Sequence, residues 1–172
     1  MILRGPRPIL LPFQKPFFLG YPGKAIIHRL KSMEVQGNET ASHKRIEVFL
    51  IDDNRMVRQS LTDLINHETD ITVSGEAGSG LEALEKIAVK KPDIVVVDIG
   101  LPDMNEVDLI TRLNHAHPDL SILAISMHDG RIFTEEILRA GAKGYIAKNQ
   151  AADDVIHAIR RIMKGGTYLS QY

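Results

Sequence analysis

The pattern of hydrophobic and polar positions changes at about residue 46. From there on, short β-branched runs alternate with segments in which hydrophobic residues recur at helical spacing. The predicted strands cover residues 47–51, 71–75, 93–97, 121–125 and 144–147. Because strands that alternate with helices build parallel sheets, the pattern predicts one doubly wound α/β domain with a five-stranded sheet and helices on both faces.

The first 45 residues differ from the rest in composition and charge. Five of the eight prolines fall within the first 22 residues, where they interrupt any helical or strand period. Residues 1–45 carry eight basic and two acidic residues, whereas the rest of the chain carries 13 basic and 20 acidic residues. The overall net charge of -1 is therefore a cancellation between a basic N-terminal part and an acidic domain.

These contrasts predict a disordered, basic, proline-rich extension over residues 1–45, a globular domain over 46–166 and a short tail over 167–172. The extension is alternatively a contact for nucleic acid or anionic lipid. The sequence has neither the ~20 successive apolar residues of a membrane helix nor a secretory signal. It also has no Cys, which is typical of a reducing compartment, so we expect a cytoplasmic protein without membrane contact.

Polar or charged residues follow four of the five predicted strands. Asp52 and Asp53 follow the first strand, Asp98 the third, Ser126 the fourth and Lys148 the fifth. Parallel strands place their carboxyl ends at one edge of the sheet, so these side chains are expected to converge there. Each alone has a structural interpretation as a helix cap, a turn residue or a solvated charge. Together they favour a functional site.

The residue types at this edge suit phosphoryl chemistry. Three neighbouring carboxylates repel one another unless a cation lies among them, and carboxylates with water are typical ligands of Mg²⁺. A carboxylate beside such a cation can attack a phosphoryl group and form an aspartyl phosphate, while a lysine and a hydroxyl contact the phosphoryl oxygens. The residues therefore predict a Mg²⁺-dependent site that becomes phosphorylated.

Four motifs follow one another in an order that is typical of a known family. They are Phe-Leu-Ile-Asp-Asp-Asn (49–54), Val-Val-Val-Asp-Ile-Gly-Leu-Pro-Asp-Met (95–104), Leu-Ala-Ile-Ser-Met-His-Asp (123–129) and Gly-Ala-Lys-Gly-Tyr-Ile-Ala-Lys (141–148). With them the chain resembles the receiver domain of bacterial two-component response regulators, over nearly three quarters of its length. The resemblance implies a flavodoxin-like fold with strand order 2-1-3-4-5 for residues 46–166.

The C-terminal residues 163–172 are similar to the junction that precedes a LuxR-type helix-turn-helix DNA-binding domain in one subfamily of response regulators. No such domain follows in this chain, so residues 167–172 are expected to be a truncated junction. DNA contact is expected only through that missing domain.

The resemblance also implies the roles of the acidic residues. Asp98 is similar to the phosphoacceptor, which takes its phosphoryl group from a sensor histidine kinase. Asp52 and Asp53 match the acidic pair that holds Mg²⁺ together with the acceptor. Gly100 matches the position whose backbone carbonyl completes the metal shell. The protein would then be a phosphoacceptor switch rather than an enzyme.

Three further residues match the parts that respond to phosphorylation. Ser126 and Lys148 are similar to the residues that contact the new phosphoryl group, and Tyr145 is similar to an aromatic that turns inward when Ser126 moves. In the family this movement remodels the surface of the fourth helix, fifth strand and fifth helix, where partners or a second copy dock. Besides Tyr145, that surface includes Arg139, Lys143 and some of His157, Arg160 and Arg161. A homodimer through this surface is therefore expected.

The turn after Asp98 departs from the family pattern. Glu106 stands where glycine is common, so a positive φ there would strain the loop unless Asn105 or Asp103 takes that conformation instead. Gly100 lacks the side chain of many relatives, which predicts an open path for hydrolytic water. If Glu106 disables the loop, a second hypothesis applies, in which the protein is an interaction module that works without phosphorylation.

Two other functions are disfavoured by the sequence. The glycine-rich stretch 75–80 invites a nucleotide-binding interpretation, but it lacks the Gly-x-Gly-x-x-Gly order and follows the second strand. We therefore predict that it connects a strand to a helix. A phosphatase with an aspartyl nucleophile needs a second aspartate two residues further on, where this chain has Gly100.

Overall fold

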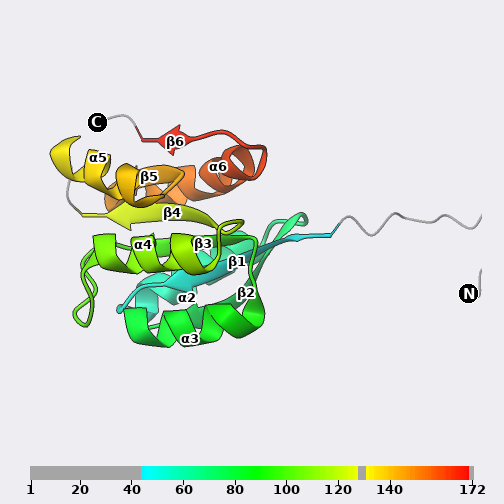
Figure 1. Cartoon of the computed structure of the whole chain (residues 1–172). Helices are drawn as coiled ribbons and strands as arrows, with labels where there is room; N and C mark the ends of the chain where they lie inside the picture. The colour runs from blue at the N-terminus through cyan, green and yellow to red at the C-terminus, as the bar shows by residue number, and fades with distance from the viewer. Residues whose placement is uncertain (1–43, 128–130, 171–172) are drawn as a thin grey trace, which may run out of the picture. The chain divides into compact units, whose positions relative to one another are not determined.

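The structure, a computed structural model, describes residues 44–127 and 131–170, which belong to the second of two units of the chain. The predicted extension over residues 1–45 lies almost wholly outside these residues. The elements, labelled as in Figure 1, are β1 (Ile46–Ile51), α2 (Arg55–Asn66), β2 (Ile71–Ala77), α3 (Gly80–Lys90), β3 (Ile94–Asp98), α4 (Glu106–Ala116), β4 (Ser121–Ser126), α5 (Arg131–Ala140), β5 (Gly144–Ala147), the 3₁₀ helix η1 (Lys148–Gln150), α6 (Ala151–Met163) and β6 (Tyr168–Leu169).

The strands form one parallel sheet in the order β2-β1-β3-β4-β5-β6. The predicted α/β class and the order 2-1-3-4-5 are confirmed for the first five strands. The sixth strand was not predicted, because two residues are too short to show a period and residues 167–172 were interpreted as a tail. Its Tyr168 N–H donates to the Lys143 carbonyl (3.1 Å), and the Ser170 N–H donates to the Tyr145 carbonyl (3.0 Å).

Helices cover both faces of the sheet (Figure 1): α3, α4 and α5 one face, α2 and α6 the other. Alternate residues of β1 serve the two cores, with Phe49 and Ile51 on the α3–α5 side and Val48 and Leu50 on the α2–α6 side. The inner strand β3 is buried along its whole length. No helix in the part of the chain that the structure describes is long and apolar enough to cross a membrane.

Three helices that follow strands, α2, α3 and α4, each begin at a side chain that accepts backbone N–H groups. Asn54 accepts from two residues of α2, Ser79 accepts from one residue of α3, and Asn105 accepts from two residues of α4. Such caps satisfy N–H groups that have no partner within the helix. They therefore fix the loops at the carboxyl edge of the sheet.

The glycine-rich stretch 75–80 is divided between a strand and a turn. Its first three residues belong to β2, which is two residues longer than predicted. Gly75 lies against the ring of Phe49, where an added Cβ would stand 2.7 Å from a ring carbon, so this strand position needs glycine. Only Gly78 and Ser79 lie between β2 and α3. The stretch serves packing and a short connection rather than a nucleotide loop.

Candidate functional site

The side chains predicted to converge lie at the carboxyl edge of the sheet. Asp52 directly follows β1, Asp98 is the last residue of β3, Ser126 is the last residue of β4 and Lys148 directly follows β5. Asp52, Asp98 and Ser126 are buried, with 3%, 8% and 0% exposure, whereas Asp53 is exposed. The edge therefore combines buried polar groups with one acid that faces solvent.

Lys148 joins two of the acids. Its Nζ lies 2.6 Å from Asp98 Oδ2 and 2.9 Å from Asp52 Oδ2. Burial alone would lower the pKa of Lys148, but its hydrogen bonds to Asp98 and Asp52 outweigh burial and raise this pKa above its usual value. Lys148 is therefore a fixed cation between the two carboxylates.

The two oxygens of Asp98 differ in their surroundings. Oδ2 accepts the hydrogen bond from Lys148, whereas Oδ1 is buried and has no hydrogen-bond partner among the described residues. Burial raises the pKa of the Asp98 carboxyl, the Lys148 hydrogen bond lowers it, and the nearby charges of Asp52 and Asp53 raise it further, with a net upward shift. A buried, unpartnered carboxylate oxygen costs stability and is unusual outside functional sites.

The acids at this edge fit a divalent cation. Asp52, Asp53 and Asp98 each place one carboxylate oxygen so that all three lie within 4.8 Å of one another. Hard oxygen ligands of this kind suit Mg²⁺, and a cation there would offset the repulsion among the three acids. Gly100 has a φ of 113° and open space where a Cβ would lie. That the Gly100 carbonyl is a ligand of Mg²⁺ stays a prediction.

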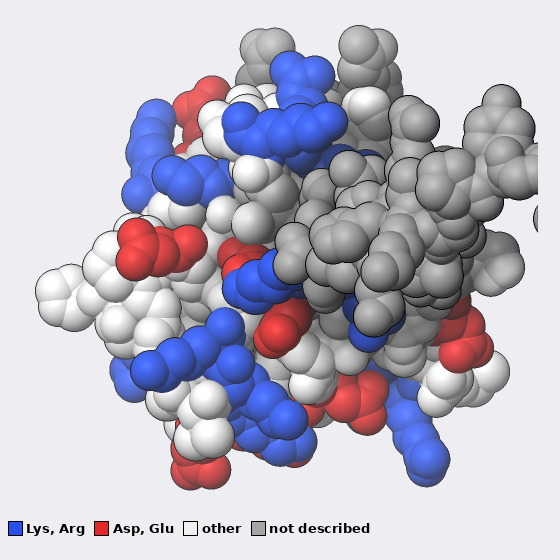
Figure 2. Space-filling view, turned by 90° about the vertical axis from the view of Figure 1, so that its right-hand side faces the viewer, with Lys and Arg blue, Asp and Glu red and all other residues white. Residues whose placement is uncertain are grey.

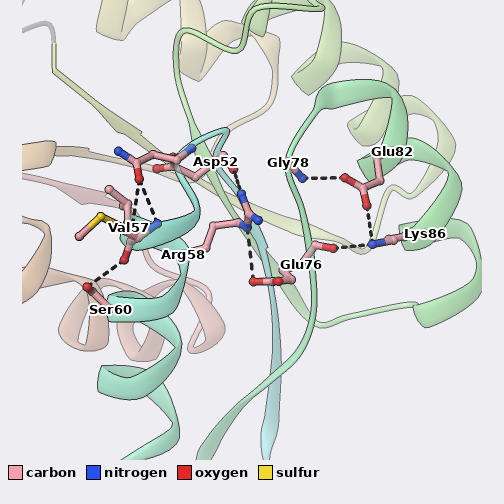
Figure 3. Close-up of polar contacts among 10 residues, drawn as sticks. Asp52, Val57, Arg58, Ser60, Glu76, Gly78, Glu82 and Lys86 are labelled. Atoms are coloured by element: carbon pink, nitrogen blue, oxygen red, sulfur yellow. Dashed lines mark hydrogen bonds and ion pairs between the residues drawn. The ribbon is translucent and has the colours of Figure 1, made fainter.

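The loop after β1 is held by hydrogen bonds on several sides. The Asp52 N–H donates to the Ala77 carbonyl (3.3 Å), and the Asn54 N–H donates to Asp52 Oδ1 (2.7 Å). In addition, Arg58 Nη1 donates to the Asp52 carbonyl at 2.6 Å (Figure 3). Arg58 was not predicted from the sequence, because an arginine within an amphipathic helix gives no sign that its side chain turns back toward a strand end.

The loop after β3 does not have the strain predicted for it. Glu106 is the first residue of α4, and Asn105 is an extended N-cap with φ -65° and ψ 136°. The only non-glycine residue with positive φ among the described residues is Lys91. The prediction of a strained Glu106, or of a left-handed Asn105 in its place, is therefore wrong, because a capped helix start needs no positive φ here. The hypothesis of a disabled loop loses its basis.

The expected switch residues lie inside the protein. Ser126 and Tyr145 are buried on the neighbouring strands β4 and β5, with 0% and 1% exposure. Tyr145 belongs to the core on the α3–α5 side of the sheet. Its proposed inward rotation stays a prediction.

A cavity of about 430 Å³ opens beside Asp98 and Lys148, between α2 and the start of α6. Apolar side chains make up much of its wall, among them Met56, Leu61 and Ala151. Met56 in this wall is 80% exposed. The cavity through which Asp98 is approached is thus largely apolar.

The fold and the acidic edge define a class, the doubly wound α/β domains that gather a ligand beyond the carboxyl ends of their strands. Within this class, the family profile of the response regulator receiver domain matches residues 48–160. The chain therefore belongs to the response regulator receiver domain family.

Individual proteins agree with this membership. The transcriptional regulatory protein DegU of Brevibacillus brevis is 30% identical over 132 residues, which are 77% of this chain and 56% of DegU. The oxygen regulatory protein NreC of Staphylococcus aureus (strain JH9) is 33% identical over 126 residues, which are 72% of this chain and 58% of NreC. The chain thus spans somewhat more than half the length of these relatives.

Solved structures show the same fold. A LuxR-family two-component response regulator from Aurantimonas sp. SI85-9A1 has a TM-score of 0.71 and 29% identity, and the match covers 74% of this chain and 91% of that chain. The response regulator domain of Thermotoga maritima CheB has a TM-score of 0.65 and 30% identity, with 70% and 98% covered. The expected relation to LuxR-family response regulators is confirmed.

Proposed function

We propose that this chain takes a phosphoryl group on Asp98 from a sensor histidine kinase and thereby changes a docking surface in signal transduction. The observation that carries the proposal is the Asp98 carboxylate, with Oδ2 fixed by Lys148 and Oδ1 buried without a hydrogen-bond partner in the described part of the chain. An oxygen that is oriented but not engaged in a hydrogen bond is suited to act as a nucleophile.

The transfer forms one bond and breaks another. Asp98 Oδ1 attacks phosphorus, while the bond from phosphorus to the donor breaks and its electron pair leaves with the donor atom, a histidine nitrogen or an acyl oxygen. Lys148 pairs with the charge that arrives, and the Ser126 hydroxyl moves toward the phosphoryl oxygens. Asp52, Asp53, Asp98 and the Gly100 carbonyl would hold Mg²⁺, which neutralises phosphoryl charge when bound.

The output surface is proposed to be formed by α5, β5 and α6, as a homodimer contact or a partner site. Tyr145 on β5 pairs in register with Ala124 on β4, two residues before Ser126, so a shift of Ser126 has a short path to this surface. Arg160 does not serve it, because its guanidinium bonds Asp70 and Glu68 near the start of β2. By analogy with DegU, whose name states transcriptional regulation, we propose a role in transcription control.

The proposal is tested by incubating the full chain with acetyl phosphate and Mg²⁺ and measuring its intact mass. We expect the mass of one added phosphoryl group, lost in Asp98→Asn and retained in Asp93→Asn, which alters the acid before the same strand. Size-exclusion chromatography of the labelled protein reads out any change of oligomeric state. Absence of labelling with both acetyl phosphate and phosphorylated histidine kinases would contradict the proposal.

A further inference from the structure

The β2–α3 turn, here residues 76–81 and so including the last two residues of β2 and the first two of α3, lies beside both loops that carry the proposed metal ligands. One loop follows β1 and holds Asp52 and Asp53, and the other follows β3 and holds Gly100. Each loop is tied to the β2–α3 turn by one charged side chain. The proposed phosphoryl transfer uses neither of these two side chains.

Arg58 ties the first loop. Its side chain is only 12% exposed although it carries a charge, and its Nη1 donates to the Asp52 carbonyl at 2.6 Å. Its Nε points to Glu76 Oε2 at 3.4 Å (Figure 3), and Nη1 lies 3.5 Å from the position of a Cβ on Gly78. One planar guanidinium therefore spans α2, the end of β1 and the end of β2.

The turn itself is fixed from the side of α3 (Figure 3). Lys86 Nζ donates to the Glu76 carbonyl at 3.0 Å and pairs with Glu82 at 2.6 Å. Glu82 in turn accepts the Gly78 N–H at 2.7 Å. Glu76, whose side chain accepts from Arg58, is thus itself held by a connected hydrogen-bond network.

Asp103 ties the second loop. Its two carboxylate oxygens accept the N–H groups of Gly80 and Leu81 at 3.0 Å each, so it caps the first turn of α3 from another segment of the chain. Beside it, Met104 packs on Gly80, where an added Cβ would stand 3.1 Å from the Met104 Cβ. These hydrogen bonds hold the pKa of the Asp103 carboxyl below its usual value.

We propose that Arg58 and Asp103 are positioning residues for the metal site, because they hold its two ligand-bearing loops against the β2–α3 turn. Mg²⁺ requires near-ideal octahedral geometry, so a small displacement of either loop weakens binding. The charge of Arg58 opposes a nearby cation, so a favourable effect of Arg58 on Mg²⁺ affinity has to come from position. This inference rests on the proposed function.

The test is a Mg²⁺ titration of the full chain followed by backbone amide NMR shifts. Arg58→Lys keeps the charge of Arg58 but loses its planar guanidinium, and Asp103→Asn removes the carboxylate charge and replaces one acceptor oxygen by an NH₂ group. In both variants we expect the Kd for Mg²⁺ to rise about three- to tenfold. In metal-free Asp103→Asn, the Gly80 and Leu81 amides should also exchange faster with solvent. Arg58→Gln replaces Arg58→Lys if the lysine variant does not fold at the titration temperature.

Arg112→Lys and Asp108→Asn are the matched controls, because among the described residues the ion pair of each side chain is the exposed i, i+4 pair that the two form on α4. Their Kd should stay within about twofold of the parent, as expected for a surface pair. A Kd within twofold in a folded Arg58 or Asp103 variant overturns the assignment of that residue. A parent protein that binds no Mg²⁺ overturns the proposed function itself, so the two failures are distinguishable.

Discussion

An aspartate lies at each end of strand β3, and the two carboxylates differ in their hydrogen bonding. Asp93, directly before the strand, accepts the Lys44 ammonium on Oδ1 at 3.0 Å and the Glu47 N–H on Oδ2 at 2.8 Å. Asp98, at the end of the strand, bonds Lys148 with one oxygen and leaves the other buried without a partner among the described residues. An aspartate side chain thus has both oxygens engaged at one end of the strand and only one engaged at the other.

The difference extends to the whole edge on each side. Figure 2 views the edge where the strands begin and shows basic and acidic side chains interspersed over its described part. There Asp70, directly before β2, pairs with Arg160 at 2.6 Å. At the opposite edge Asp52, Asp53 and Asp98 are brought together around Lys148. Like charges concentrated at one edge destabilise the folded protein. Such a cluster is retained where it serves to bind a cation or a phosphoryl group.

The largest effect is expected from removing the cation at the carboxyl edge. Lys148→Met should lower the free energy of unfolding of the metal-free protein by about 2 kcal/mol, because Asp98 and Asp52 lose their partner in a largely buried site. Lys44→Met, at the other edge, should leave it almost unchanged, because Lys44 is 75% exposed. Urea unfolding without Mg²⁺ measures both. Equal losses would show that the two edges are equivalent.

The next effect concerns the backbone on either side of β3, where Lys91 and Gly100 both have positive φ. Gly100→Ala should destabilise the protein by about 1.5 kcal/mol, since a φ of 113° disfavours any side chain even in open space. Lys91→Gly should stabilise it by about 0.5 kcal/mol, because a left-handed helix end favours glycine. Thermal unfolding measures both, and shifts of the same sign would contradict the argument.

The aspartates themselves give a smaller contrast of opposite sign. Asp98→Asn should raise the free energy of unfolding without metal by about 1 kcal/mol, because it removes a buried charge that faces two other acids. Asp93→Asn should lower it only slightly, because it weakens the exposed ion pair with Lys44. Both are measured by urea unfolding. If Asp98→Asn destabilises the protein, the ion pair with Lys148 contributes more to stability than the burial of the Asp98 charge costs.

The fold and the site edge could be predicted from the sequence because both rest on local patterns. Alternation of strands with helical periods defines parallel βαβ units, and parallel strands bring Asp98 and Lys148 to one edge wherever the helices pack. What was missed depends on contacts between distant segments. The partners of Arg58 and Asp103 are backbone groups in other elements, and β6 forms only because β5 offers an edge. The error at Glu106 came from assuming that a family glycine marks a positive φ.

The smallest effect is the pH dependence of the ion pair at the amino edge. Hydrogen bonding to the Arg160 guanidinium lowers the pKa of Asp70 below its ordinary value of 3.8. A lowered pKa in the folded state means that the pair stabilises the protein above pH 4 and loses its effect as the pH falls through the folded-state pKa.

The measurement is the difference in free energy of unfolding between the parent and Arg160→Met. It should be about 0.5 kcal/mol and constant from pH 7 to pH 5, because Asp70 and Glu68 are partly exposed, and it should shrink below pH 4. Salt at 1 M should reduce it at neutral pH, since screening acts on exposed pairs. A difference that grows on acidification would show that Arg160 stabilises the protein through packing of its aliphatic stem. Ion pairing would then not be what stabilises the edge where the strands begin, and the contrast with the edge at Asp98 would be weaker.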